Sequence, residues 1–222
     1  MTDDEFAGQV AGVSALADPV RRALYRFVVD AGAPMSRDQV AAGAGVARHT
    51  AKFHLDRLVD DGLLDIEFRR LSGRRGPGAG RPAKLYRRSA REFTVSLPAR
   101  HYDVAGRILA TGVDRATAEG RPVREAVREA ARTEGRRLGQ DGGKRALLQV
   151  LTDLGYEPRR EGERVMLANC PFHTLAAEHT DLVCGVNTDM LTALLDERGA
   201  DRMRAELDPE PGRCCVVLRP AP

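Results

Sequence analysis

The strongest constraint on the fold is a succession of patterns between residues 13 and 88. Apolar residues from Val13 to Val29 recur at close to a helical period, and the pair Asp18-Pro19 predicts a helix start with aspartate as the N-cap. Ser36 predicts the N-cap of a short second helix, and a longer third helix is expected from about Ala47 to Asp61. Helix, short helix, tight turn and longer helix is the order of a helix-turn-helix.

The third of these helices separates its residues into two faces. Ala51, Leu55 and Leu58 recur at helical spacing and predict a buried stripe. The residues that lie off this stripe, near the N-terminal end, are Arg48, His49, Thr50, Lys52 and Phe53. This is the part of a recognition helix that meets base edges in the major groove. His54 lies beside the apolar stripe, so we expect a packed structural histidine rather than a DNA contact.

Two expected strands, residues 63–68 and 83–87, flank a segment rich in glycine, proline and arginine. They predict a β-hairpin wing whose basic residues contact phosphates or a minor groove: Arg69, Arg70, Arg74, Arg75, Arg81 and Lys84. The net charge of the whole chain is only +3, yet the segment Ile66–Arg91 holds nine basic residues against the single acid Glu67. A solvated loop is the alternative, but the position of this basic segment in the wing favours a polyanion contact.

Residues 13–88 resemble the winged-helix domains of ArsR-like bacterial repressors. The resemblance is carried by Ala17-Asp18-Pro19-Val20-Arg21, by Thr50-Ala51-Lys52-Phe53-His54-Leu55-Asp56-Arg57-Leu58, and most specifically by Gly80-Arg81-Pro82-Ala83-Lys84-Leu85-Tyr86. It implies a winged helix-turn-helix that binds a double-stranded DNA operator, in agreement with the residue patterns. It also implies a homodimer, because in such repressors the helix after the wing often builds the dimer.

Three helices are expected next, over residues 99–118, 122–139 and 144–154. The second carries many charged residues at i, i+4 spacing, so we expect it to be mostly exposed. A strand over residues 163–167, paired with the charged stretch before it, then predicts a hairpin.

The last part of the chain reads as short helices followed by strands. A helix over residues 174–183 is expected to break at Cys184–Asn187, and a further helix is expected over 189–195. A hairpin of residues 202–207 and 213–218 ends the chain. The predicted fold class is therefore α+β in three parts: a winged helix-turn-helix DNA-binding domain (1–92), a helical linker and dimerisation region (93–155), and a cysteine-containing α+β sensor domain (156–222).

Composition excludes several classes of protein. No stretch approaches about 18 apolar residues, so no membrane span is expected. The acidic start MTDDEFAG has no signal-peptide pattern, so we expect a cytoplasmic protein. In that compartment the four cysteines are expected to be thiols or ligands rather than structural disulfides.

All four cysteines lie in the last 53 residues: Cys170, Cys184, Cys214 and Cys215. Thiolates suit zinc, copper(I) and iron–sulfur clusters, and His173 could complete a ligand set. Because neighbouring residues of a strand point to opposite faces, only one of Cys214 and Cys215 is expected to face the site, which leaves three cysteines there. The spacing includes no CxxC pair, so cysteines that merely pack as small apolar residues remain an alternative.

The segment Cys170-Pro171-Phe172-His173, with Leu175, His179, Cys184 and Cys214-Cys215, is similar to the Suf-operon repressor (SufR) branch of these regulators. The resemblance implies a repressor that senses an iron–sulfur cluster, with Cys170, Cys184 and one of Cys214 and Cys215 as ligands. Members of that branch have a further cysteine where this chain has Met166. Three outcomes stay open: a cluster completed by His173 or an outside ligand, a zinc or other metal site, or no metal.

The sequence thus predicts a homodimeric DNA-binding regulator whose C-terminal part senses a metal, an iron–sulfur cluster or a redox state. A second hypothesis keeps the DNA binding but gives the C-terminal part a small-molecule effector pocket with structural cysteines. An enzyme is not expected, because Cys170 with His173 or His179 lacks a third orienting group and an oxyanion element.

Overall fold

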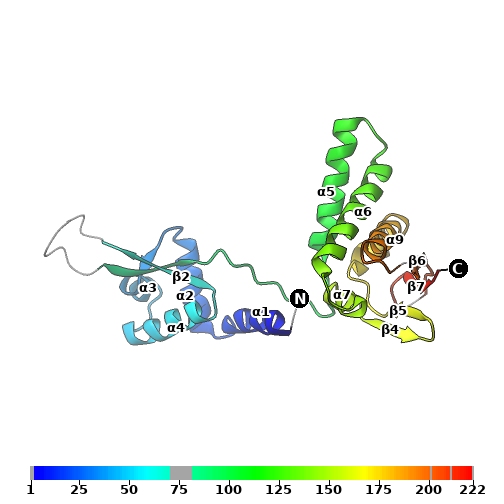
Figure 1. Ribbon diagram of the computed structural model, residues 1–222. Helices are drawn as coiled ribbons and strands as arrows, with labels where there is room; N and C mark the ends of the chain where they lie inside the picture. Colours follow the sequence, from blue (N-terminus) through cyan, green and yellow to red (C-terminus); the bar gives the residue numbers. More distant parts are fainter. Residues whose placement is uncertain (1–2, 71–81, 201, 211, 222) are drawn as a thin grey trace. The chain divides into compact units, whose positions relative to one another are not determined.

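The computed structural model describes residues 3–70, 82–200, 202–210 and 212–221. It divides into two compact units, Met1–Val95 and Ser96–Pro222, which are coloured blue to green and green to red in Figure 1. The three parts predicted from the sequence therefore become two units. The helices of residues 93–155 share a hydrophobic core with the strands and helices that follow them, so residue 155 marks no division between compact units.

The first unit is a bundle of short helices with an antiparallel sheet. Its elements in chain order are α1 (Asp3–Ala15), α2 (Pro19–Asp30), β1 (Met35–Ser36), α3 (Arg37–Gly43), α4 (Arg48–Asp60), β2 (Leu64–Arg69) and β3 (Ala83–Arg88). The strand order is β1–β3–β2, and β2 and β3 pair from Leu64 with Arg88 to Arg69 with Ala83. The predicted helix-turn-helix order and the predicted wing hairpin are confirmed.

Local sequence explains where these helices begin. The Asp18 side chain accepts a hydrogen bond from the backbone N–H of Arg21 at 2.8 Å, and Pro19 opens α2 without needing a hydrogen-bond donor. Ser36 and Gln39 form a reciprocal capping box at the start of α3. Gly62, at a φ of +76°, follows the end of α4 in a left-handed conformation that glycine adopts without strain.

The predicted helical run from Val13 to Val29 is wrong in one respect, because the structure contains two helices. α1 ends at Ala15 and α2 begins at Pro19, as the Asp18 cap requires. The sequence patterns also predict no helix before Val13, where most of α1 lies. This helix packs through Ala15 and through Gly12, whose hydrogen faces the Phe93 ring so closely that a Cβ would lie 2.1 Å from a ring carbon. Contact with a segment that is distant in the sequence thus stabilises this helix.

The second unit packs helices against an antiparallel sheet. Its elements are α5 (Tyr102–Glu119), α6 (Val123–Gly142), α7 (Leu147–Asp153), β4 (Pro158–Glu161), β5 (Arg164–Leu167), α8 (His173–Glu178), α9 (Thr180–Glu197), β6 (Met203–Leu207) and β7 (Val216–Pro220). The strand order is β4–β5–β7–β6. Both predicted hairpins are confirmed, β4 with β5 and β6 with β7.

The prediction that the second helix of this unit is mostly exposed is wrong. α6 lies between α5 and α9 (Figure 1) and buries a face of small residues and leucine: Ala126, Val127, Ala130, Ala131, Glu134, Gly135, Leu138, Gly139 and Gly142. At Gly135 an added Cβ would lie 2.1 Å from the Met190 carbonyl oxygen of α9. The charge pattern concealed this face, because alanine and glycine carry weak hydrophobic signals yet allow two helices to approach closely.

The predicted break at Cys184–Asn187 is also wrong, since α9 runs without interruption from Thr180 to Glu197. The break between helices falls earlier, at His179, which ends α8. Gly185 is compatible with the helix, because packing along α6 offsets the roughly 1 kcal/mol that a helical glycine costs relative to alanine. Asn187 is fully buried within α9 rather than serving as an N-cap.

In the part of the chain that the structure describes, no helix combines the length and the apolar character needed to cross a membrane.

Candidate nucleic-acid interface and cysteine site

The exposed face of α4 carries the residues that the sequence assigned to base contacts. Arg48, His49, Lys52 and Phe53 are exposed, and Thr50 is half-buried. Phe53 has 66% of its surface exposed, although aromatic side chains usually seek the core. The opposite face of the helix buries Ala51, Leu55 and Leu58, so the core holds α4 rigidly while this face stays free.

Arg48, at the first position of α4, is oriented by a carboxylate on the preceding helix. Its guanidinium lies 2.7 Å from the Asp38 carboxylate of α3, while 72% of its side chain remains exposed. Such an exposed pair contributes little stability. Its role is therefore to orient a cation that stays available at the N-terminal end of α4.

Lys84 connects the wing to the same helix. Its ammonium lies 2.6 Å from Asp56 on α4, and it stands 5.0 Å above the ring centre of Tyr86, whose hydroxyl donates to the same carboxylate at 3.0 Å. Burial would raise the pKa of Asp56, but the hydrogen bonds from Lys84 and Tyr86 outweigh it, and the pKa lies below its usual value. Lys84 was predicted as a DNA contact, and in the structure its charge is directed at Asp56 within the unit.

The remaining wing residues divide into those the structure describes and those it does not. Arg69 is exposed and pairs with Glu67 at 2.7 Å, and Arg70 is exposed at the end of the described strand. Arg74, Arg75 and Arg81 lie outside the described residues, so their assignment to phosphate contacts stays a prediction.

His54 has the packed structural role expected from the sequence. It is buried on the core side of α4, and the Arg21 guanidinium donates to its Nδ1 at 3.5 Å. The same arginine approaches Asp61 at 3.9 Å, so it connects α2 to the end of α4. This contact helps to hold α4 against the rest of the unit.

The four cysteines meet in the second unit as two pairs. Cys184, in the second turn of α9, is disulfide-bonded to Cys215, which lies just before β7. Cys170, in the connection between β5 and α8, carries a free thiol hydrogen-bonded to the free thiol of Cys214. Cys214 and Cys215 point to different partners, as neighbouring residues of an extended chain do. Instead of three cysteines sharing one site, the structure has two adjoining pairs.

A buried polar network surrounds the Cys170–Cys214 pair. The Asn187 amide donates to the Cys214 sulfur at 3.3 Å, and the hydroxyl of the fully buried Tyr156 donates to the Asn187 carbonyl oxygen. The hydrogen bond between the two thiols lowers the pKa of Cys170 to about 7, and the same bond together with burial raises the pKa of Cys214. The proton of the pair is therefore held on Cys214, and Cys170 is the more easily ionised thiol.

The expectation that no cysteine forms a disulfide is corrected by the Cys184–Cys215 bond. The predicted sulfur and imidazole ligand set does not assemble in this disulfide-bonded form. His173 is exposed at the start of α8. Within residues 3–70, 82–200, 202–210 and 212–221, no three His, Cys, Asp or Glu side chains form a group that could hold a metal ion.

Comparison with known families identifies the first unit. A family model described as a helix-turn-helix domain matches residues 16–67. The match covers α2 to α4 and most of β2, the segment that carries the exposed face described above. No curated protein and no solved structure matches the chain.

The helix-turn-helix domain supports a DNA-binding regulator of transcription. The third helix within the match, α4, has the position that the recognition helix takes in a helix-turn-helix, and four of the five residues selected from the sequence are exposed on it. Their individual contacts with DNA remain predictions.

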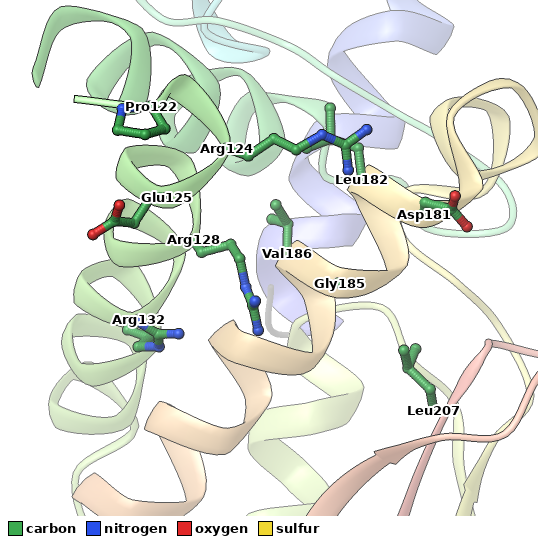
Figure 2. Close-up of a pocket in the computed structure, with 10 residues that line it drawn as sticks. All are labelled: Pro122, Arg124, Glu125, Arg128, Arg132, Asp181, Leu182, Gly185, Val186 and Leu207. Carbon is green, nitrogen blue, oxygen red and sulfur yellow. The ribbon is translucent and has the colours of Figure 1, made fainter. Parts of the chain in front are cut away.

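Sequence reasoning missed a pocket between α6 and α9, which Figure 2 shows with its lining side chains. Three of these are Arg124, Arg128 and Arg132, spaced four residues apart on α6. That spacing is visible in the sequence as one arginine per helical turn. By itself the spacing indicates a solvated face, because nothing local in the sequence shows that α9 packs alongside.

Proposed function

We propose that the protein is a dimeric transcriptional repressor whose second unit senses the redox state of its thiols. The observation that carries the proposal is the convergence of all four cysteines, from three separate segments, in the unit that follows the helix-turn-helix domain. DNA binding is supported by that domain and by the exposed cationic face of α4.

The DNA-binding part of the proposal rests on α4 and the wing. An exposed helix face with arginine and lysine at its N-terminal end fits the major groove, where such side chains donate to guanine and to phosphates. A homodimer would place two recognition helices about 34 Å apart, one turn of B-DNA. The exposed apolar side chains Tyr102 and Val113 on α5 and Val123 on α6 support a subunit contact through these helices.

The sensing part of the proposal rests on a two-electron exchange. Reduction of the Cys184–Cys215 disulfide by a dithiol reductant yields two thiols and a new disulfide in the reductant, so atoms and electrons balance. Cys215 is half-buried, so a reductant can reach this pair more readily than the buried Cys170 and Cys214. Reduction would release α9 from the segment before β7, and thereby change the packing of the helices proposed to form the dimer.

A metal or an iron–sulfur cluster does not fit the disulfide-bonded form, because two of the four sulfurs are bonded to each other. Reduction would leave all four cysteines as thiols, so binding of a metal is a property that we expect only of the reduced protein. Anaerobic purification followed by metal analysis and a visible absorption spectrum tests this point. A visible band with bound iron would favour the cluster, and bound zinc without colour would favour a zinc site.

A second candidate function is a regulator with a small-molecule effector, in which the cysteines only stabilise the fold. The observation that favours it is the pocket between α6 and α9. The two functions differ in their response to reductant. DNA affinity should depend on thiol state in the redox regulator and should not depend on it in the effector regulator.

The experiment for the proposed function begins with selection of bound duplexes from a random DNA pool by the full-length protein. The expected result is an enriched sequence with two half-sites related by two-fold symmetry, and a 2:1 protein-to-duplex ratio in sedimentation. Peptide mapping of non-reduced protein should recover the Cys184–Cys215 crosslink. The proposal fails if no sequence is enriched, or if the crosslink does not form under any oxidising condition.

A further inference from the structure

The second unit contains a pocket of about 510 Å³ between α6 and α9. Its floor is formed by Leu182, Gly185 and Val186 of α9, and Leu207 at the end of β6 closes one side. Figure 2 shows Val186 between the two helices and Leu182 beside the Arg124 guanidinium, while Leu207 lies on the other side of α9. The volume lies within the range of about 300–1,000 Å³ that is typical of small-molecule sites.

The α6 wall of the pocket is cationic. Arg124, Arg128 and Arg132 all line it, and one carboxylate, that of Asp189, serves two of them. Asp189 binds Arg128 at 2.6 Å and Arg132 at 3.1 Å. In the described part of the chain no carboxylate pairs with Arg124. Three guanidinium groups thus face one carboxylate, which leaves an excess of positive charge.

The other acidic residues at the pocket do not cancel this excess. Glu125 is held by Arg121 at 2.9 Å, and Figure 2 shows its carboxylate pointing away from α9. Asp181 lies in the first turn of α9, and Figure 2 shows its carboxylate pointing away from the arginines. Figure 2 also shows Arg124 extending from α6 towards Leu182, so the unpaired cation lies at the edge of the apolar floor.

Gly185 makes the floor accessible. A Cβ added at this position would have no atom within 4 Å, apart from its own neighbours and helix backbone. The space above the α9 backbone is therefore open, and an apolar group can lie against it. This glycine is unlike Gly135, which is required for close helix packing.

We propose that this pocket binds a small monocarboxylate with an apolar body. The planar guanidinium of Arg124 matches the two oxygens of a carboxylate, and Arg128 adds a second donor. Leu182, Val186 and Leu207 bury the apolar body. As a binding site the pocket is independent of the function proposed above, and only its role as an effector site rests on that function. The pocket and the Cys184–Cys215 disulfide share one turn of α9, so ligand and thiol state would act on the same helix.

The test is calorimetric titration of the full-length, disulfide-bonded protein with octanoate. Saturable binding with one site per chain is expected. 1-Octanol, which has the same tail without the charge, and acetate, which has the charge without the tail, should each bind at least tenfold more weakly. Equal binding of octanoate and 1-octanol would overturn the role of the arginines.

Matched variants locate the site. Arg124→Ala should weaken octanoate binding at least tenfold, and Gly185→Phe, which fills the open space, should abolish it. The control, Arg136→Ala, removes an exposed arginine from the same helix but outside the pocket. It should bind octanoate as the unmodified protein does. Circular dichroism establishes that each variant remains folded.

Undiminished binding of octanoate by folded Gly185→Phe would overturn the proposal, as would the absence of binding at millimolar octanoate. Sedimentation showing that this face is covered by a second copy, with octanoate excluded, would also overturn it. None of these results affects DNA selection by the helix-turn-helix domain, so the failure of the pocket and the failure of the proposed regulator are distinguishable. Conversely, octanoate binding by a protein that selects no DNA would retain the pocket and reject the regulator.

Discussion

The two units differ in where their candidate functional side chains lie, which is on the surface in the first unit and in the interior in the second. In the helix-turn-helix unit the residues proposed to contact DNA, such as Arg48 and Lys52, stand exposed on an otherwise conventional core. In the second unit the reactive groups are inside: Cys170 and Cys214 are buried beside Asn187 and Tyr156. A recognition surface needs only a rigid support, whereas a set of cysteines from three segments needs the complete tertiary structure. Changes to core packing should therefore affect function in the second unit, and surface changes should affect it in the first.

The largest effect is expected from Gly135→Val in the second unit. An added Cβ would lie 2.1 Å from the Met190 carbonyl oxygen, and a helix backbone cannot give way as a side chain can. We expect a loss of about 3 kcal/mol or more in unfolding free energy, measured by urea denaturation. Gly106→Ala is the control, because an added Cβ there meets nothing within 4 Å. Gly106→Ala should raise the free energy of unfolding by about 0.5–1 kcal/mol. An unchanged free energy of unfolding in Gly135→Val would show that α6 and α9 are not closely packed.

The next largest effect is expected on the surface of the first unit. Arg48→Ala and Lys52→Ala should each cost about 1–3 kcal/mol in binding of the selected duplex, without changing thermal stability. Fluorescence anisotropy with labelled DNA measures this. Arg26→Ala removes an exposed charge from α2 and should leave affinity unchanged. If the α2 variant binds as poorly as the α4 variants, the effect reflects net charge and not the recognition helix.

The wing should behave differently from the recognition helix. Replacing both Arg74 and Arg75 by alanine should weaken binding to specific and non-specific duplexes alike. The slope of log affinity against log salt should decrease by the equivalent of about two phosphate contacts. Titrations at several salt concentrations measure the slope of log affinity against log salt. A slope identical to that of the unmodified protein would refute the assignment of these arginines to phosphates.

The smallest effect is a pH dependence of stability in the second unit. Hydrogen bonds from Arg137 and the positive charge of Arg107 outweigh burial and hold the pKa of Glu134 below its usual value. A lowered pKa in the folded state gives stability that is present above the unfolded value of about 4.3 and is lost as the pH falls through the lowered value.

The melting temperature should therefore decrease between about pH 5 and pH 3. Glu134→Gln should reduce that decrease, because an amide does not titrate. Glu161→Gln, which alters an exposed ion pair with Arg164, should leave the decrease unchanged. If both variants show the same decrease in melting temperature with acid, then ionisation of Glu134 does not contribute to the pH dependence of stability.

Sequence patterns predicted the first unit well because its signals are local. The Asp18 cap, the Ser36 capping box and Gly62 each act within a few residues of the helix end that they define. The exposed face of α4 followed from helical periodicity alone. α1 was missed because its fold depends on contact with Phe93, a residue far along the chain.

The second unit was predicted less well because its signals are non-local. The run of α9 through Gly185 and the burial of α6 both depend on packing between two helices that 37 residues of chain separate. The pairing of Cys184 with Cys215, rather than with Cys170 or Cys214, cannot be derived from spacing. It follows from the positions of α9 and of the segment before β7. Sequence alone could thus locate the cysteines in the last part of the chain but could not predict how they pair.

In the proposed regulator, the thiols of the second unit control DNA binding by the first. The direct measurement is the affinity of the full-length protein for its selected duplex, with the Cys184–Cys215 disulfide formed and after reduction by a dithiol. We expect the two affinities to differ by at least about fivefold, and a Cys184→Ser/Cys215→Ser variant to show the same affinity in both conditions. Equal affinities for the oxidised and the reduced protein, with the crosslink verified by mass spectrometry, would contradict the claim.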